Sequence, residues 1–491
     1  MRLPIAFVSS TLVLLSALRV SAHIGPGFAM PESRDVVHHH LRSRGTNGRL
    51  MLRAAPSSES QESSEQDPSQ ECKPYGLKSS SALGKVYPKA GQIADIVSGD
   101  DTGATLFKEI LDSGIIPGNV QVKKGTQGNM GIDQGQSDSY DDSDPDCWWT
   151  ATGCTSPKHK QLSHDLDSCP EPNTWGLSFD DGPNCSHNAF YDFLQKEKLR
   201  ATLFYIGTNV IDWPLQAQRG LTDGHDICVH TWSHHYTTTL STSQVFSELY
   251  YTMRIIKDVI GVTPRCWRPP YGDVDDRVRA IATALGLRTI VWDHDTDDWN
   301  IVPGGKQSTA KIESNYQKII DAGKNGSTAD KGIMVLTHEL TNQTMDMFMN
   351  EYSKVKAAYK NLVPISACMN ASSPYVEDQP TYSNFADFTS GKVDAQGLPQ
   401  PDAIKINVNS KLNITSEKDQ KSAGGFSSAS AKKSKTQGDS SSSSPDSQAS
   451  AAPNSNKSSD KEDGNSASFT PIHVLSISMT AALVSFASWA L

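Results

Sequence analysis

Short apolar runs alternate with helix-length amphipathic segments through the middle of the chain. Each run is short enough for a strand and is bounded by polar or turn-forming residues. Strict alternation of strands and helices predicts an α/β fold with a parallel sheet, either open or rolled into a barrel. The seven predicted strands are 175–179, 201–206, 226–230, 266–268, 289–292, 333–336 and 364–368.

The segment 241–261 gives the clearest helix prediction. Ser241 and Gln244 have the spacing of a capping box at its start. Apolar residues follow at intervals of three and four positions, and Gly261 and Pro264 end the pattern. The sequence therefore predicts a helix that packs through one apolar face.

The flanking segments have a different composition. Residues 23–160 are rich in Ser, Asp, Gly and Gln, and we interpret them as an N-terminal pro-region or spacer that is mostly extended and of low order. Residues 400–465 have almost nothing apolar to bury and predict a Ser-rich, disordered, O-glycosylated stalk. One folded domain is therefore expected between the two flanks.

Both ends of the chain resemble targeting signals. Residues 1–22 combine Arg2, an apolar run and a small-residue cleavage site, which predicts a secretory signal peptide. Residues 466–491 form an uncharged apolar tail that follows small residues, which predicts a glycolipid (GPI) anchor attached at Asn465 or Ser466. A transmembrane helix is the alternative for this tail. No basic cluster follows it, which favours the anchor.

Export agrees with the sequons and the cysteines. The predicted N-glycosylation sites are Asn325, Asn342, Asn370, Asn413 and Asn456. Eight cysteines in an exported chain predict disulfides rather than thiol chemistry.

Two cysteine pairs can be proposed from position. Cys169 and Cys368 nearly bracket the folded region and are expected to pair, and Cys147 and Cys154 are expected to close a local loop. The pairing of the other four stays open. The formal net charge of −10 and the lack of a basic stripe argue against a nucleic-acid partner.

Reactive residues follow the predicted strands at their carboxyl ends, where parallel sheets place their active sites. Asp180 and Asp181 follow the first strand, and the histidines of HTWSH, His230 and His234, follow the third. Two imidazoles and one carboxylate with an open position form a hydrolytic zinc arrangement. Further polar segments, RPPYGD, DHDTDDW and LTHE, follow the fourth, fifth and sixth strands.

The adjacent acids Asp180 and Asp181 need not share one role. Consecutive residues leaving a strand point to different sides, so one carboxylate can bind a metal while the other acts as a base. A bound cation also relieves the repulsion between the two charges.

The ordered segments SFDDGP, HTWSH, RPPYG, DTDDW and LTH resemble the five motifs of the NodB-type polysaccharide deacetylases, carbohydrate esterase family four. The resemblance covers residues 169–370, which are therefore expected to form the catalytic domain. It implies a distorted (β/α) barrel with seven strands, in agreement with the strand count above.

The resemblance also implies a role for each residue of the first three motifs. Asp181, His230 and His234 would hold one divalent metal ion, zinc or cobalt. Asp180 would be the general base, and Arg268 would orient it through a charge-assisted pair.

Further roles are implied for the later motifs. The backbone N–H of Tyr271 would stabilise the oxyanion, and His338 would be the general acid, held cationic by Asp295. Trp299 and Leu336 would shape the substrate groove and the acetyl pocket, although Trp299 could equally be a core residue. The alternatives for the role given to Asp295 are Asp293, Asp297 and Asp298.

Within this family the exported layout, the sequons and the apolar tail resemble the fungal chitin deacetylases. The implied activity is hydrolysis of N-acetyl groups in chitin, giving chitosan and acetate at the fungal cell surface. The implied partners are chitin, the cell wall and, through the anchor lipid, the membrane. Two alternatives are deacetylation of another polysaccharide, such as xylan or peptidoglycan, and a catalytically dead wall protein that binds glycans.

Overall fold

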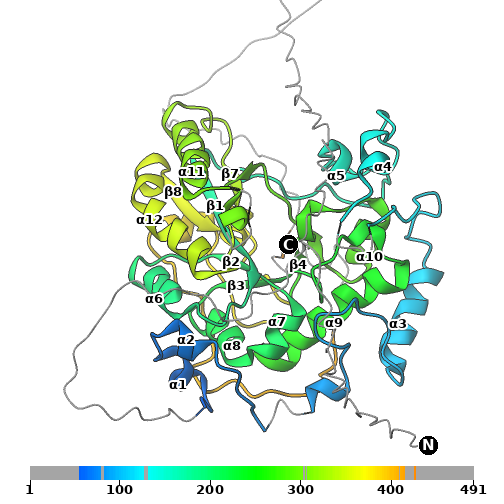
Figure 1. The fold of residues 1–491 in the computed structure, drawn as a ribbon, viewed down its shortest axis with the longest axis horizontal. Coiled ribbons are helices and arrows are strands. Elements are labelled where there is room, and N and C mark those ends of the chain that lie inside the picture. The colour runs from blue at the N-terminus through cyan, green and yellow to red at the C-terminus, as the bar shows by residue number, and fades with distance from the viewer. Residues whose placement is uncertain are drawn as a thin grey trace, which may run out of the picture. The chain divides into compact units, whose positions relative to one another are not determined.

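The computed structural model describes residues 55–78, 82–126, 131–301, 305, 307–408, 410–414 and 425–426. Its centre is a sheet whose paired strands all run parallel (Figure 1). The strands are β1 (Thr174–Gly182), β2 (Thr202–Tyr205), β3 (Asp226–Val229), β4 (Cys266–Trp267), β5 (Arg288–Thr289), β6 (His294–Asp295), β7 (Ile333–Leu336) and β8 (Asn361–Pro364).

The sheet is rolled into an incomplete barrel. The hydrogen-bonded order is β5-β4-β3-β2-β1-β7-β6, and β8 pairs with the first half of β1. Residues 290–293 lead directly from β5 to β6, so the chain itself joins the two edges of the sheet. Because β5 and β6 together take the place of one predicted strand, the seven strand positions of the expected distorted (β/α) barrel are confirmed.

Two predicted strands differ from the observed ones. The run 289–292 is interrupted, because the chain leaves the edge at β5 and pairs again with β7 as β6. The run 364–368 is mostly helical: β8 ends at Pro364, and the helix α13 (Ile365–Cys368) follows.

Helices cover the outside of the sheet (Figure 1). The capping box predicted at Ser241 and Gln244 is present, and Gly261 ends that helix with a φ of 94°. The helices that alternate with strands are α6 (Asn188–Lys196), α7 (Gly207–Asp212), α8 (Pro214–Thr222), α9 (Thr242–Ile260), α10 (Asp276–Ala284), α11 (Thr309–Lys324) and α12 (Asn342–Ala358).

Four disulfides fix the fold. The predicted pairs Cys169–Cys368 and Cys147–Cys154 are both present. The pairs that the sequence leaves open are Cys228–Cys266, which links β3 to β4, and Cys72–Cys185. The last one ties the N-terminal segment to the loop that follows β1.

The expectation of a mostly extended spacer before residue 160 differs from the structure. The described part of this segment contains helices and contributes buried side chains to the main core, among them Leu83, Tyr87 and Ile110. Its helical elements are α1 (Glu59–Ser63), α2 (Pro68–Glu71), η1 (Leu83–Lys85), α3 (Asp101–Asp112), α4 (Gln134–Asp138) and α5 (Trp149–Thr152).

Apart from the amphipathic helix α3, this segment is held by anchors without apolar periodicity, which explains why the sequence misses most of it. The backbone N–H of Ala94 donates to the buried Glu248 carboxylate of α9 at 2.7 Å. The apolar face of α3, isolated apolar side chains elsewhere and the Cys72–Cys185 disulfide hold the remainder. Periodicity analysis detects regular elements that bury a face, and it is blind to single anchors of this kind.

The first residues of the predicted stalk differ from the expectation of disorder. The backbone N–H groups of Asn407 and Ser410 donate to the Asp258 carbonyl and carboxylate at 2.8 and 2.7 Å. Leu412 and Ile414 pack against the core, so residues 400–408 and 410–414 follow the surface of the domain. The rest of 400–465, the signal peptide and the anchor segment lie outside the described residues. Within the described ranges, no helix combines the length and the hydropathy that a membrane span requires.

Exposure differs among the predicted sequons. Asn325, Asn370 and Asn413 are exposed, and Asn342 is half-buried at the start of α12. Asn456 lies outside the described residues. Glycosylation at all five positions stays a prediction.

Candidate active site

A β-bulge at the end of β1 positions the two adjacent acids. Asp180 pairs with Phe204 and Gly182 pairs with Tyr205, so Asp181 is the extra residue of the bulge. Asp181 has a φ of 71°, in the left-handed region. A bulge of this kind redirects a side chain. As a result both carboxylates face one histidine, whereas strict strand alternation would place them on opposite sides.

The predicted metal ligands converge. A carboxylate oxygen of Asp181 lies 3.3 Å from His230 Nε2 and 3.1 Å from His234 Nε2. The three potential ligand atoms lie within 4.8 Å of one another. The same Asp181 oxygen is buried and makes no hydrogen bond among the described residues. A buried carboxylate oxygen between two imidazole nitrogens fits a divalent cation.

Contacts on the far side of each ring orient the histidines. His230 Nδ1 lies 2.8 Å from the Arg268 carbonyl, which makes Nδ1 the protonated nitrogen and leaves Nε2 free to bind a metal. His234 Nδ1 lies 3.2 Å from the Tyr271 hydroxyl. Burial alone would raise the pKa of Asp181, but the two neighbouring imidazoles hold that pKa well below its usual range.

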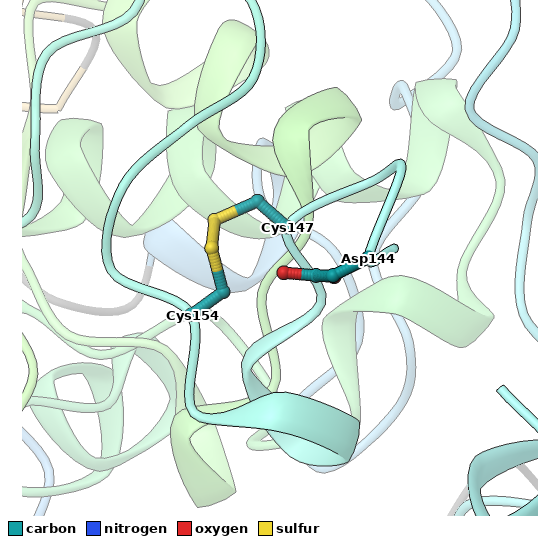
Figure 2. Close-up of side chains that lie close together, drawn as sticks. All are labelled: Asp144, Cys147 and Cys154. Carbon is teal, nitrogen blue, oxygen red and sulfur yellow. A yellow bond between two sulfur atoms is a disulfide. The ribbon is translucent and has the colours of Figure 1, made fainter. Parts of the chain in front are cut away.

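Asp144, Cys147 and Cys154 also lie close together, but they are no metal site. The two sulfur atoms are joined in a disulfide (Figure 2). A disulfide sulfur is not a thiolate, and the thiolate is the form that ligates metals. Only the Asp181, His230 and His234 group in the described part of the chain has ligands that suit a cation.

Asp180 stands beside this group and is paired with Arg268. Its Oδ2 lies 3.8 Å from His230 Nε2, and its Oδ1 accepts a hydrogen bond from Arg268 Nη1 at 2.7 Å. Arg268 is fully buried and also donates to Ser178 Oγ at 2.9 Å. Its guanidinium carbon lies 4.2 Å from the centre of the Phe204 ring. The predicted pair is therefore present, with one face of the arginine covered by an aromatic ring.

His338 lies next to Asp180, on the β7 side of β1. An isolated parallel bridge pairs Asp180 with His338, and the Asp180 backbone N–H donates to the Thr337 carbonyl at 3.0 Å. This pairing extends the β1–β7 contact beyond the end of β7. The predicted base and the predicted acid are thus on adjacent strands at one edge of the sheet.

The partner of His338 is Asp298, and the prediction of Asp295 is wrong. Asp298 Oδ1 lies 2.6 Å from His338 Nδ1, and Asp298 Oδ2 accepts the His338 backbone N–H at 2.9 Å. Burial alone would lower the pKa of His338, but the charge and hydrogen bond of Asp298 raise it to about 10. Asp295 is exposed, and its carboxylate instead accepts the Asp297 backbone N–H.

A change of backbone conformation accounts for this difference. The short strand β6 ends at Asp295, and a 3-10 helix, η5 (Asp298–Ile301), begins three residues later. The tighter turn brings Asp298 into a fully buried position next to His338. The sequence segment DTDDW contains no signal that distinguishes the four acids near it.

The remaining predicted residues lie at the same edge. Tyr271 is half-buried, has a φ of 58° and stacks on Tyr236 with ring centres 4.0 Å apart. Leu336 is buried, and its carbonyl accepts the Thr296 hydroxyl at 2.9 Å. Trp299 is half-buried in η5. Their roles in oxyanion and substrate binding stay predictions.

Left-handed backbone conformations are concentrated here. Asp181, Thr231, His234 and Tyr271 all have positive φ values, between 56° and 71°. Such conformations cost free energy in residues other than glycine and persist where the surrounding structure imposes them. The fold therefore holds the motif residues in fixed, strained positions.

Sequence reasoning misses Glu248, which orients the HTWSH loop. This fully buried carboxylate accepts the backbone N–H groups of Trp232 and Ser233 at 2.9 and 2.8 Å. Those residues lie between His230 and His234, the two predicted metal ligands. The available signal is an acid on the otherwise apolar face of α9, three positions after Val245.

Comparison with known proteins agrees with this geometry. The polysaccharide deacetylase family profile matches residues 167–290. The chain is 44% identical over 386 residues to chitin deacetylase 2 of Cryptococcus neoformans var. grubii, covering 78% of this chain and 81% of that protein. It is 54% identical over 235 residues to a chitin deacetylase of Amylomyces rouxii, covering 48% and 55%.

Among solved structures, the chitin deacetylase from the fungal pathogen Colletotrichum lindemuthianum aligns with a TM-score of 0.38 and 24% identity, over 42% of this chain and 92% of that one. The sequence relationship to the Cryptococcus protein extends over most of both chains, well beyond the five motifs. By that relationship and the family profile, this chain belongs to the polysaccharide deacetylase family.

Proposed function

We propose that this protein hydrolyses the N-acetyl groups of N-acetylglucosamine residues in chitin, releasing acetate and leaving chitosan. The main support for this proposal is that three groups of residues lie together at one edge of the sheet. These are the Asp181 group with its two histidines, the Arg268-paired Asp180, and the Asp298-paired His338. Amide hydrolysis needs a nucleophile and a proton donor for the amine, and this edge offers both.

Asp180 is placed to act as the general base. It removes a proton from the attacking water, whose oxygen then bonds to the acetyl carbon. The pair with Arg268 holds the carboxylate in one orientation.

His338 is placed to act as the general acid. Its pKa of about 10 keeps the ring protonated at neutral pH, so it can give a proton to the amine nitrogen as the C–N bond breaks. The products are acetate and a free amine on the sugar. Nδ1 faces Asp298, so the opposite ring nitrogen is the one available to the substrate.

Asp181, His230 and His234 would hold the divalent cation, and we propose zinc, with cobalt as the alternative. Such a cation supplies Lewis acidity to a carbonyl oxygen and makes water more acidic. The family generally depends on a divalent metal. We assign the oxyanion position to the Tyr271 backbone N–H, whose direction is set by the left-handed backbone at that residue.

Chitin is favoured over other acetylated polymers by the relatives. Proteins at 44% and 54% identity are named chitin deacetylases, whereas a named peptidoglycan-N-acetylmuramic acid deacetylase is 30% identical over 213 residues. A dead glycan-binding protein is disfavoured, because the base, the acid and all three ligands are retained.

Substrate choice can be tested directly. We expect acetate release from chitin oligomers to exceed that from acetylated xylan and peptidoglycan at least about tenfold in kcat/KM, since the pocket must position the amide and the sugar together. Acetate would be measured enzymatically with the purified protein. A larger rate on either other polymer would replace chitin as the substrate.

We also propose that the protein is exported and attached by a GPI anchor to the outer face of the plasma membrane and the cell wall. The support is the N-terminal apolar signal, the sequons and the C-terminal apolar tail with small residues at its start. Asn465 or Ser466 is the proposed attachment residue.

The anchor predicts release by a lipase. Treatment of membranes with a phosphatidylinositol-specific lipase should move the protein into the soluble fraction, because the apolar tail has been exchanged for a lipid. Membrane retention, with Leu491 still found in the C-terminal peptide by mass spectrometry, would indicate a spanning helix instead.

A further inference from the structure

Two tryptophans from distant parts of the chain meet beside the active site. Trp149 of α5 and Trp292, between β5 and β6, have ring centres 4.9 Å apart. Both rings are half-buried. Both residues lie outside the residues 167–290 that the family profile matches, and Trp149 belongs to the N-terminal segment. The pair is therefore formed partly by a segment to which the active-site motifs assign no role.

Trp149 contacts two residues near the reacting groups, Trp292 on one side and Gly272 on the other. Trp292 lies 5.8 Å from the guanidinium carbon of Arg268, which holds Asp180. On the other side, a Cβ added to Gly272 would come within 2.3 Å of the Trp149 ring. The indole thus lies directly on the backbone next to Tyr271. The tryptophan pair is continuous with the wall of the active site.

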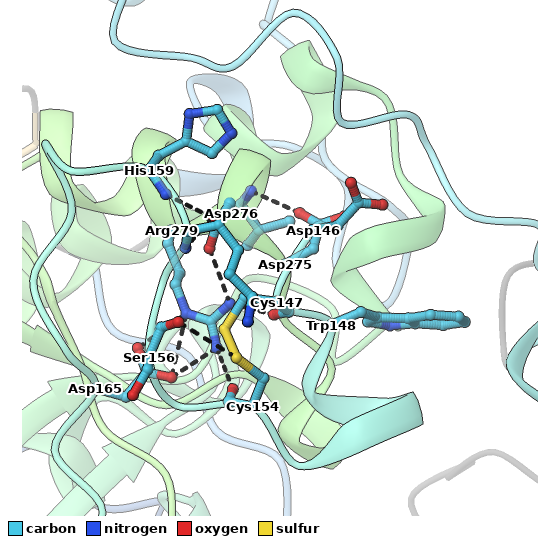
Figure 3. A network of polar contacts seen from close by, with 12 residues as sticks. Asp146, Cys147, Trp148, Cys154, Ser156, His159, Asp165, Asp275, Asp276 and Arg279 are labelled. Carbon is cyan, nitrogen blue, oxygen red and sulfur yellow. Dashed lines mark hydrogen bonds and ion pairs between the residues drawn. A yellow bond between two sulfur atoms is a disulfide. The ribbon is translucent and has the colours of Figure 1, made fainter. Parts of the chain in front are cut away.

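The loop that carries Trp149 is held rigidly, and its anchors are other residues. The Cys147–Cys154 disulfide closes the loop, and Arg279 donates to the carbonyls of both cysteines at 2.6 and 2.8 Å (Figure 3). Arg279 is itself buried and paired with Asp165 at 2.7 Å. One side chain of α10 therefore fixes both ends of the loop.

The residues on either side of Trp149 add a second anchor. The fully buried Trp148 donates its indole N–H to Asp273 Oδ1 at 2.9 Å, and the Thr150 hydroxyl donates to the same oxygen at 2.6 Å. The Trp149 backbone N–H donates to the Val274 carbonyl at 3.0 Å. These bonds fix the backbone without the Trp149 indole. The half-buried ring of Trp149 is therefore held in one position before a ligand binds, which reduces the conformational entropy lost on binding.

We propose that Trp149, together with Trp292, binds a sugar residue of the substrate chain next to the residue that is deacetylated. The proposal rests on the function proposed above. A pyranose ring presents an apolar face of C–H groups, and flat, rigid aromatic rings suit such a face. The occupant is the continuing N-acetylglucosamine chain, because the tryptophan pair borders the active-site residues. Trp149 is in this account a specificity-determining residue supplied by the N-terminal segment.

The experiment compares Trp149→Ala and Trp149→Phe with wild type on chitin dimer and pentamer. We expect Trp149→Ala to lower kcat/KM on the pentamer about tenfold, mainly through KM, because loss of an aromatic contact of about 1.4 kcal/mol corresponds to that factor. The effect on the dimer should be smaller, because a dimer can place its second sugar on the other side of the deacetylated residue, away from Trp149. Trp149→Phe should stay within about threefold of wild type. Trp213→Ala is the matched control, since Trp213 is also half-buried but packs on Tyr75.

A binding measurement separates this contact from catalysis. In an Asp180→Asn background, calorimetry with chitin pentamer should show a Kd about tenfold weaker after Trp149→Ala and nearly unchanged after Trp149→Phe or Trp213→Ala. An unchanged Kd, or equal losses on dimer and pentamer with unchanged KM, would overturn the proposal. If wild type releases no acetate from any chitin oligomer, the proposed function fails. If wild type is active and Trp149→Ala shows the same chain-length dependence as wild type, only this inference is refuted.

Discussion

Asp180→Asn is expected to retain the bound metal and to lose activity about a thousandfold, the usual scale for loss of a general base. The carboxamide cannot take a proton from water, but the ligand atoms of Asp181, His230 and His234 stay in place. The measurement is metal content by elemental analysis together with acetate release from chitin pentamer.

His234→Ala is the contrasting variant. It removes one of the three proposed ligands, so we expect both metal content and activity to fall. The folded state of each variant is checked by its thermal transition. Equal loss of metal in Asp180→Asn and His234→Ala would show that Asp180 is also a ligand, and the division of roles between the two adjacent acids would be wrong.

Asp298→Asn is expected to move the alkaline limb of the pH–rate profile to lower pH and to lower the maximum about a hundredfold. A general acid works only while protonated, so activity is lost as pH rises through its pKa in the protein. Burial lowers the pKa of His338, and Asp298 is the main group that raises it, to about 10. Removing the charge of Asp298 therefore shortens the pH range in which His338 can donate.

The quantity compared is the position of the alkaline limb, in pH, between Asp298→Asn and wild type. Asp181 and Asp180 also raise the pKa of His338, and a bound cation would offset their charges. Asp298 contacts Nδ1 of His338, the ring nitrogen that does not face the substrate, and therefore keeps its effect on the pKa. Asp295→Asn is the control, because Asp295 is exposed and makes no hydrogen bond to His338 among those described. If Asp295→Asn moved the alkaline limb as far as Asp298→Asn, the assignment of the partner would be wrong.

These two predictions differ in how far the sequence could reach them. The order of motifs at the carboxyl ends of strands places Asp180, Asp181, His230 and His234 together, because parallel strands end at one edge. The structure confirms that convergence. It also adds the bulge at Asp181. The sequence does not reveal this bulge, because two adjacent aspartates give no sign of which one is the extra residue.

The sequence could not identify Asp298 as the partner of His338, for a related reason. Residues 293–298 contain four acids, and the choice among them depends on where β6 ends and η5 begins. A shift of the backbone by one or two residues would exchange one carboxylate for another. Element boundaries of this kind are set by tertiary packing and are the least predictable feature of a sequence.

The N-terminal segment shows a different limit. Its attachment relies on Cys72–Cys185, on the Ala94 contact with Glu248, and on Arg279 under the Cys147–Cys154 loop. All three join residues far apart in the chain, and none leaves a periodic pattern. Composition alone therefore indicates a spacer where the structure has an ordered part of the domain.

Metal dependence is the most direct test of the account. Acetate release from chitin pentamer would be measured with protein stripped by a chelator, before and after Zn²⁺ or Co²⁺ is added to about one equivalent. The Asp181, His230 and His234 group predicts that stripped protein is inactive and that one equivalent restores its rate. Full acetate release by protein shown to contain no metal would contradict the proposed chemistry.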